Sequence, residues 1–163
     1  MQKLWCLSFE NFKEFALSNG YDKKVPDNVA VISIVNTITT EEEIYHICEG
    51  DNVLNLDFDD IDPLAFGFPE NIETYVQDDI NIHFFTDKMA DKAVEFILRH
   101  KDKDFYIHCA AGISRSQAFI KFIKNIFDEI SWETNPNNPC QHPNGFVFQK
   151  LMNSYRCRNF KIE

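Results

Sequence analysis

The sequence predicts an α/β fold, with a central, mainly parallel sheet of four to five strands flanked by helices. Short apolar segments typical of strands alternate along the chain with segments of helical periodicity. Residues 29–35, VAVISIV, are mostly β-branched and apolar, which is typical of a strand buried on both faces of a parallel sheet. With 163 residues, of which 44% are hydrophobic, the chain is long enough to bury a core as a single domain over residues 1–163.

Apolar and alternating segments predict three further strands. KLWCLSF, residues 3–9, is a short strand near the N-terminus, and NVLNLDF, residues 52–58, alternates in part. DFYIH, residues 104–108, is short and apolar and leads directly into Cys109. These segments are separated by helical patterns, so their strands are expected to pair in parallel.

The spacing of apolar residues predicts helices in residues 8–17, 40–47, 81–104, 116–130 and 146–155. The second of these helices begins with a capping-box pattern formed by Thr40 and Glu43. Residues 59–79 contain two prolines, a glycine and many acids, so we expect a long loop there. Residues 131–145 are predicted to be a loop because of their proline and asparagine content.

The charge and the cysteines exclude several classes of protein. The net charge of -10 argues against binding to nucleic acid, which needs clustered Lys and Arg, and against docking on an anionic membrane. No apolar run is as long as a membrane span, and no secretory signal is expected at the N-terminus. The five cysteines are widely spaced and odd in number, which is typical of free thiols in a reducing cytoplasm rather than of a disulfide framework.

The stretch HCAAGISRS, residues 108–116, carries the strongest indication of chemistry. It follows a predicted strand that ends at His108 and precedes a helix that begins near Ser114 or Arg115. This order points successive backbone N–H groups, and the positive end of a helix dipole, at one spot. The loop residues are mostly small, so the backbone is predicted to curl around an anion through residues Ala110, Ala111, Gly112, Ile113, Ser114 and Arg115.

Arg115 and Cys109 give this anion site a reaction. The guanidinium of Arg115 matches two oxygens of a phosphate, and the same positive field favours the thiolate of Cys109 at the rim of the loop. A bound dianion then faces a nucleophile at a fixed distance. The stretch therefore predicts phosphoryl transfer to sulfur, in which backbone N–H groups and Arg115 carry the developing charge without a metal or a cofactor.

HCAAGISRS resembles the His-Cys-x-x-Gly-x-x-Arg-Ser/Thr signature of cysteine-dependent protein phosphatases, and most resembles the dual-specificity branch with its compact microbial and viral relatives. The resemblance is strong over residues 104–130 and weaker over 29–63. In the last helix it rests on HPNGFVFQKL, which is similar to a Pro-Asn-x-x-Val element of that family.

The resemblance implies a protein tyrosine phosphatase-like fold and a reaction through a phosphocysteine at Cys109. It implies that Arg115 holds the phosphoryl group and that Ser116 eases the departure of the thiolate. His108 would orient and tune the cysteine from behind, although a satisfied histidine at the end of a strand is an equal interpretation of that residue.

The same family takes its general acid from a loop that follows a core strand, and FDDIDP offers several aspartates there. The resemblance favours Asp60, although Asp60 lies 49 residues before Cys109, a longer interval than is usual in the family. Residues 63–79 are then an insertion behind the acid loop. The alternatives are Asp59 and Asp62, with Asp78 and Asp79 as more distant candidates, while Asp57 is expected to be a solvated strand residue.

Two functions follow from these residues. The first is an enzyme that hydrolyses phosphotyrosine in proteins or peptides, with phosphoserine and phosphothreonine as further substrates. The alternative is a catalytically weak module that binds phosphorylated proteins. Zinc bound by Cys140, His142 and Cys157 with the His108–Cys109 pair is disfavoured, because the chain has no CxxC or HxxxH pair.

Overall fold

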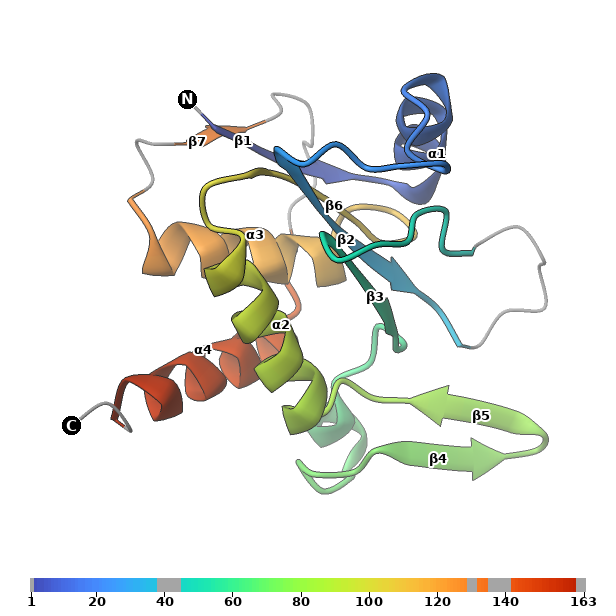
Figure 1. Ribbon diagram of the computed structural model, residues 1–163. Helices are drawn as coiled ribbons and strands as arrows, with labels where there is room; N and C mark the ends of the chain where they lie inside the picture. Colours follow the sequence, from blue (N-terminus) through green and yellow to red (C-terminus); the bar gives the residue numbers. More distant parts are fainter. Residues whose placement is uncertain (1, 38–44, 129–131, 135–141, 161–163) are drawn as a thin grey trace.

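Five parallel strands form the centre of the molecule. The computed structural model describes residues 2–37, 45–128, 132–134 and 142–160 (Figure 1). Its main sheet has the order β3-β2-β6-β1-β7, and every pairing in it is parallel. The strands are β1 (Gln2–Leu7), β2 (Val29–Val35), β3 (Val53–Asp57), β6 (Asp104–His108) and β7 (Trp132–Thr134). The predicted fold class is therefore confirmed, with β2 at full burial along its length.

The helices cover the two faces of this sheet unequally. Among the helices of the described residues, only α1 (Phe9–Ser18) packs on one face, where Phe12 and Ala16 meet Val31 and Tyr106. The other face is covered by α2 (Asp87–Arg99), α3 (Arg115–Ile126) and α4 (Gly145–Phe160), which bury the larger core (Figure 1). Alternation along each strand decides which side chains enter which core. In β6, Phe105 and Ile107 belong to the larger core, while Tyr106 belongs to the core beneath α1.

Because the strands run in parallel, the segments that follow them meet at one edge of the sheet. These segments begin after Leu7, Val35, Asp57 and His108. Ligands of open parallel sheets bind at the carboxyl ends of the strands, where loops can approach one another. The cysteine loop after β6 and the acidic loop after β3 therefore lie at the same edge, although they are far apart in sequence.

Residues 63–83 contain more regular structure than the sequence predicts. A 3-10 helix, η1 (Pro63–Phe66), is followed by an antiparallel hairpin of β4 (Thr74–Gln77) and β5 (Ile80–His83). The predicted helix over residues 81–104 was therefore wrong in its first turns. It begins only at Asp87, where Thr86 accepts a 3.1 Å hydrogen bond from the Met89 N–H as its N-cap.

Two other predictions need correction. Residues 132–134 form β7, which pairs with β1, where a loop was expected. The proposed helix over residues 40–47 is not supported in its last part, because Tyr45 to Ile47 are irregular, and Thr40 and Glu43 lie outside the described residues. Both errors concern short segments whose conformation depends on the neighbours they pack against.

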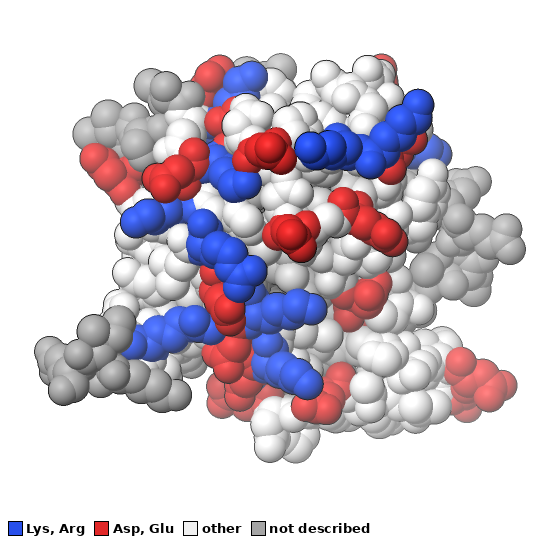
Figure 2. All heavy atoms as spheres, in the orientation of Figure 1, with Lys and Arg blue, Asp and Glu red and all other residues white. Residues whose placement is uncertain are grey.

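The surface seen in Figure 2 carries positive and negative side chains interspersed with one another, without a large area of one sign. Among the helices of the described ranges, none has the length and apolar character to cross a bilayer.

Candidate functional site

The loop between β6 and α3 is held from outside by its carbonyl groups. Its carbonyl oxygens accept hydrogen bonds of 3.0 to 3.3 Å, from Phe9 N to Ala110, from Gln117 Nε2 to Gly112, from His142 N to Ile113 and from Asn144 N to Ser114. In a trans peptide the N–H points away from the C=O. Because these carbonyl groups point outward to their partners, the N–H groups of the same peptides point into the loop, where an anion can bind.

Gly112 is required at its position by both conformation and space. Its φ of +72° lies in the left-handed region, which other residues rarely adopt. A Cβ there would lie 2.8 Å from the carbonyl carbon of Leu7 and 2.9 Å from the nitrogen of Ser8. Because these atoms are backbone, they cannot move aside as a side chain could. The loop thus packs directly against the end of β1.

Cys109 lies at the base of this loop and is 2% exposed. Its sulfur accepts a hydrogen bond from the Gly112 N–H at 3.2 Å and lies 3.0 Å from the hydroxyl of Ser116. Both groups can donate to a thiolate, so the surroundings of the sulfur suit a negative charge.

A second cysteine lies behind the first. The thiol of Cys6 is 3.1 Å from the Ser116 hydroxyl and 3.4 Å from the Gly112 carbonyl oxygen. Burial raises the pKa of Cys6 from 9.0 to about 12, against the opposing effect of the Ser116 hydrogen bond, and the neighbouring Cys109 raises it further. Cys6 therefore stays protonated, and its single S–H has two acceptors, the Gly112 carbonyl oxygen and the nearer Ser116 oxygen. When it donates to Ser116, the Ser116 hydroxyl proton can face Cys109.

Arg115 brings a buried guanidinium to the same place. It is 3% exposed, and its Nη1 donates a 2.8 Å hydrogen bond to the carbonyl oxygen of Phe58. Its Nε is buried and has no hydrogen-bond partner among the described residues. A buried donor without a partner is costly, and an oxyanion in the loop would satisfy it.

Asp60 lies at the rim of the loop, as the resemblance implied. Its Oδ1 accepts hydrogen bonds of 2.8 Å from the Ser114 hydroxyl and from the Asn144 side-chain amide. Asn144 also caps α4, because its Oδ1 accepts a hydrogen bond from Val147 N. Neither bond uses Oδ2 of Asp60, so this oxygen is available to a bound molecule.

The other candidate acids are used elsewhere. Asp59 is buried and accepts hydrogen bonds from the Thr37 N–H and hydroxyl and from the His83 N–H. Asp62 caps η1 through a 2.9 Å bond from Leu64 N. Asp78 and Asp79 form the turn of the β4–β5 hairpin, which projects from the main sheet in Figure 1.

His108 lies behind Cys109 on the side of the sheet that α1 covers. Its ring is fully buried, stacks on Phe12 at 4.4 Å between centroids, and contacts the Ser33 hydroxyl through Nε2 at 2.7 Å. Burial lowers the pKa of His108 from 6.5 to about 3, and the charges of His46 and Arg115 act in the same direction, although the backbone of Cys109 partly opposes them. His108 is therefore a neutral histidine at neutral pH.

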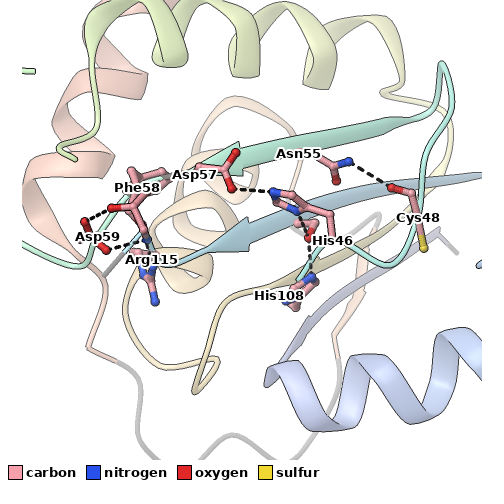
Figure 3. Close-up of polar contacts among 10 residues, drawn as sticks. His46, Cys48, Asn55, Asp57, Phe58, Asp59, His108 and Arg115 are labelled. Carbon is pink, nitrogen blue, oxygen red and sulfur yellow. Dashed lines mark hydrogen bonds and ion pairs between the residues drawn. The ribbon is translucent and has the colours of Figure 1, made fainter. Parts of the chain in front are cut away.

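Several residues of this site were missed by the sequence analysis. Thr37 fixes the acid loop through Asp59, and Cys6 supports Ser116. Ser33 and His46 extend the polar contacts of His108, and Figure 3 shows His46 and His108 in this arrangement. The only sequence signal for any of them was Ser33, a polar residue within an otherwise apolar strand.

Within the described residues, no group of three or more His, Cys, Asp or Glu side chains is arranged to hold a metal ion. Cys140, one of the disfavoured zinc ligands, lies outside the described residues, and Cys6, Cys48, Cys109 and Cys157 form no disulfide with one another. No protein-family model matches the chain, and no curated protein matches it closely enough to be called a relative.

Proposed function

We propose that the chain is a cysteine-dependent protein phosphatase that hydrolyses phosphotyrosine through a phosphocysteine intermediate, with phosphoserine and phosphothreonine as further substrates. The observation that carries this proposal is the position of the Cys109 sulfur, which has donors at 3.0 and 3.2 Å and lies in a loop that ends in a buried guanidinium. The resemblance of residues 108–116 to the phosphatase signature supports it independently.

In the first step, the Cys109 thiolate attacks the phosphorus of the bound monoester. The S–P bond forms, the ester P–O bond breaks, and the leaving phenolic oxygen takes a proton from Asp60. The N–H groups of the loop and the guanidinium of Arg115 stabilise the equatorial oxygens as charge develops on them. Oδ2 of Asp60, which the Ser114 and Asn144 bonds leave available, is the oxygen that carries this proton.

In the second step, water attacks the phosphocysteine. The Asp60 carboxylate takes the proton from the water, the S–P bond breaks, and inorganic phosphate leaves. The departing sulfur becomes a thiolate between the Ser116 hydroxyl and the Gly112 N–H, which stabilise its charge. Neither step requires a metal or a cofactor. We place this activity in the cytoplasm, where the free thiols of the chain would stay reduced.

The test is hydrolysis of p-nitrophenyl phosphate and of a phosphotyrosine peptide by the wild type and by Cys109→Ser. Cys157→Ser serves as the matched control, because Cys157 is exposed and lies on α4. We expect Cys109→Ser to lose turnover and the control to keep it. Equal turnover in both variants would remove the proposal.

The same experiment separates an enzyme from a binding module. If the wild-type protein, immobilised on a column, retains a phosphotyrosine peptide but releases no phosphate from it, the protein is a module that binds phosphorylated proteins. Rapid quenching with a ³²P-labelled peptide should trap a phosphorylated wild-type protein, and this label should be absent from Cys109→Ser.

A further inference from the structure

A chain of four polar side chains leads from the surface to the residue before Cys109 (Figure 3). Oδ1 of Asp57 lies 2.8 Å from Nε2 of His46, and Nδ1 of His46 lies 2.7 Å from the Ser33 hydroxyl. The same hydroxyl lies 2.7 Å from Nε2 of His108. The side chain of Asp57 is 60% exposed, while Ser33 and His108 are fully buried.

The heavy atoms of this chain are held in place by the fold. Ser33 and His108 are register partners on the neighbouring strands β2 and β6, so their side chains share one face of the sheet. Phe12 stacks on the His108 ring, and the Asn55 side chain donates to the carbonyl of Cys48, which fixes the segment that carries His46. Protons can therefore change places along the chain while the side chains stay where they are.

The single proton of the Ser33 hydroxyl links the states of the two histidines. It can be donated to only one of the two nitrogens beside it, and the hydroxyl oxygen then accepts from the other. If Ser33 donates to His46, then His46 is neutral and His108 carries its proton on Nε2. If Ser33 donates to His108, the chain holds one more proton, taken up from solvent at its exposed end. His46 then donates to both Ser33 and Asp57 as an imidazolium, and the proton of His108 is on Nδ1.

The second arrangement favours a thiolate at Cys109. Nδ1 of His108 is buried and has no hydrogen-bond partner among the described residues, and the backbone of Cys109 favours a proton in this region. Because Nε2 faces Ser33, a proton on Nδ1 places the positive end of the neutral imidazole dipole on another edge of the ring, in the region where the backbone of Cys109 acts on His108. The ionised carboxylate of Asp57 stabilises the imidazolium of His46, which this arrangement requires.

We propose that Asp57 and His46 are positioning residues that act through Ser33 to place the proton of His108 on Nδ1 and thereby keep Cys109 reactive. This inference rests on the proposed function, because it takes Cys109 as the nucleophile. Other charged or titratable groups around the chain include Arg115, which acts on His108, and Lys13 of α1, whose ammonium lies 5.9 Å from the centre of the ring of Tyr45, the residue before His46. At its exposed end, Asp57 lines a surface hollow together with Glu73, His83, Lys88 and Lys92.

The central test is Asp57→Asn, with Asp57→Glu to restore the carboxylate and Asp102→Asn as a control for the loss of an exposed aspartate elsewhere. Two readouts need no phosphatase activity. Imidazole ¹H–¹⁵N spectra of histidine-labelled protein distinguish the two tautomers of His108. Mass spectrometry follows the rate at which iodoacetamide alkylates Cys109, separately from the exposed Cys157.

We expect Asp57→Asn to move the proton of His108 to Nε2 and to slow alkylation of Cys109 at neutral pH by about five- to tenfold, the size of one ordinary hydrogen bond. Asp57→Glu and Asp102→Asn should behave as the wild type does. The direction is diagnostic, since the through-space effect of removing a negative charge would favour the thiolate and speed alkylation.

A double variant tests the path. If Ser33 carries the effect, Asp57→Asn should change nothing further in a Ser33→Ala background. An unchanged tautomer in Asp57→Asn, or faster alkylation in that variant, would overturn the inference whether or not the protein hydrolyses phosphate. Wild-type Cys109 that does not react with iodoacetamide, in a protein that releases no phosphate, would instead overturn the proposed function and the effect on Cys109 that rests on it. The tautomer of His108 would then still decide whether Asp57 and His46 place its proton.

Discussion

The hydroxyl of Ser114 donates a 2.8 Å hydrogen bond to Oδ1 of Asp60, which lies 54 residues earlier in the chain. Ser114 occupies the N-cap of α3 but makes no side-chain capping bond there. A serine in this position usually bonds a backbone N–H of the first helical turn. Its hydroxyl instead joins the two loops that follow β3 and β6, so a residue of the cysteine loop also positions the aspartate at its rim.

Replacement of Asp60 should lower the turnover of substrates with poor leaving groups most. We expect Asp60→Asn to lower kcat on a phosphotyrosine peptide by about 10²- to 10³-fold, the usual size of general acid–base catalysis. The loss should be smaller with p-nitrophenyl phosphate, whose leaving group departs readily as an anion. Asp62→Asn is the control, because Asp62 caps η1. A loss in Asp62→Asn with full activity in Asp60→Asn would show that the acid is assigned to the wrong residue.

The hydrogen bond from Ser114 to Asp60 should contribute less to kcat than Asp60 itself does. We expect Ser114→Ala to lower kcat on the phosphotyrosine peptide by about three- to tenfold, since one hydrogen bond is worth about 1 kcal/mol. If the hydroxyl acts by positioning Asp60, Ser114→Ala should cost almost nothing further in an Asp60→Asn background. Steady-state kinetics of the two single variants and the double variant provide this cycle, and additive losses would contradict a positioning role.

Gly112 should tolerate no side chain. Gly112→Ala combines a positive φ with a Cβ less than 3.0 Å from backbone atoms of Leu7 and Ser8, so we expect it to lower the free energy of unfolding by about 2 to 4 kcal/mol and to abolish turnover. Gly67→Ala is a matched control, because Gly67 has a similar φ of +77° but no atom within 4 Å of the added Cβ. It should lose only about 1 kcal/mol in urea denaturation. Equal losses in the two variants would mean that the close approach to β1 is unimportant.

Asp59 should matter for stability more than for chemistry. Its buried carboxylate accepts hydrogen bonds from the N–H groups of Thr37 and His83, and Asp59→Ala would remove this acceptor from both donors. We expect a loss of about 2 to 4 kcal/mol in the free energy of unfolding, measured by urea denaturation. A loss below about 0.5 kcal/mol, which is typical of a surface substitution, would show that Asp59 does not hold the acid loop.

The parts of the fold that follow from local pattern could be predicted from the sequence. The apolar run Val29–Val35 became the fully buried strand β2, and the strand before Cys109 and the helix after it lie where the sequence placed them. Such elements are dictated by burial on both faces or by helical periodicity, which are properties of the segment itself. The positions of Cys109 and Arg115 relative to these elements follow for the same reason.

Features that depend on pairing between distant segments could not be predicted. Strand β7 is only three residues long and exists because β1 offers it an edge. The roles of the aspartates after β3 were left open, because adjacent acids look alike in sequence, whereas in the fold one bonds Ser114, one bonds Thr37 and one caps η1. The contacts of His46 with Ser33 and Asp57 are likewise long-range, and no local pattern indicates them.

The buried, neutral state of His108 should make the protein sensitive to acid. Its folded-state pKa of about 3 lies below the ordinary 6.5 of an unfolded chain, so between these values the unfolded chain binds a proton that the folded protein does not. Stability from this group is therefore fully present above pH 6.5 and is lost as the pH falls toward 3, by about 1.4 kcal/mol for each pH unit. At pH 5 the loss amounts to about 2 kcal/mol.

Urea denaturation of the wild type and of His108→Gln at pH 7.5, 6 and 5 measures this effect. Glutamine keeps a polar group near Ser33 but does not titrate, so its free energy of unfolding should fall less on acidification than that of the wild type. The difference between the two proteins should approach about 2 kcal/mol at pH 5. His100 contributes acid sensitivity of the same sign, because burial lowers its pKa too, but it is present in both proteins and cancels in the comparison. Parallel curves for the two proteins would show that His108 is accessible to protons in the fold, and the neutral imidazole behind Cys109 would have to be abandoned.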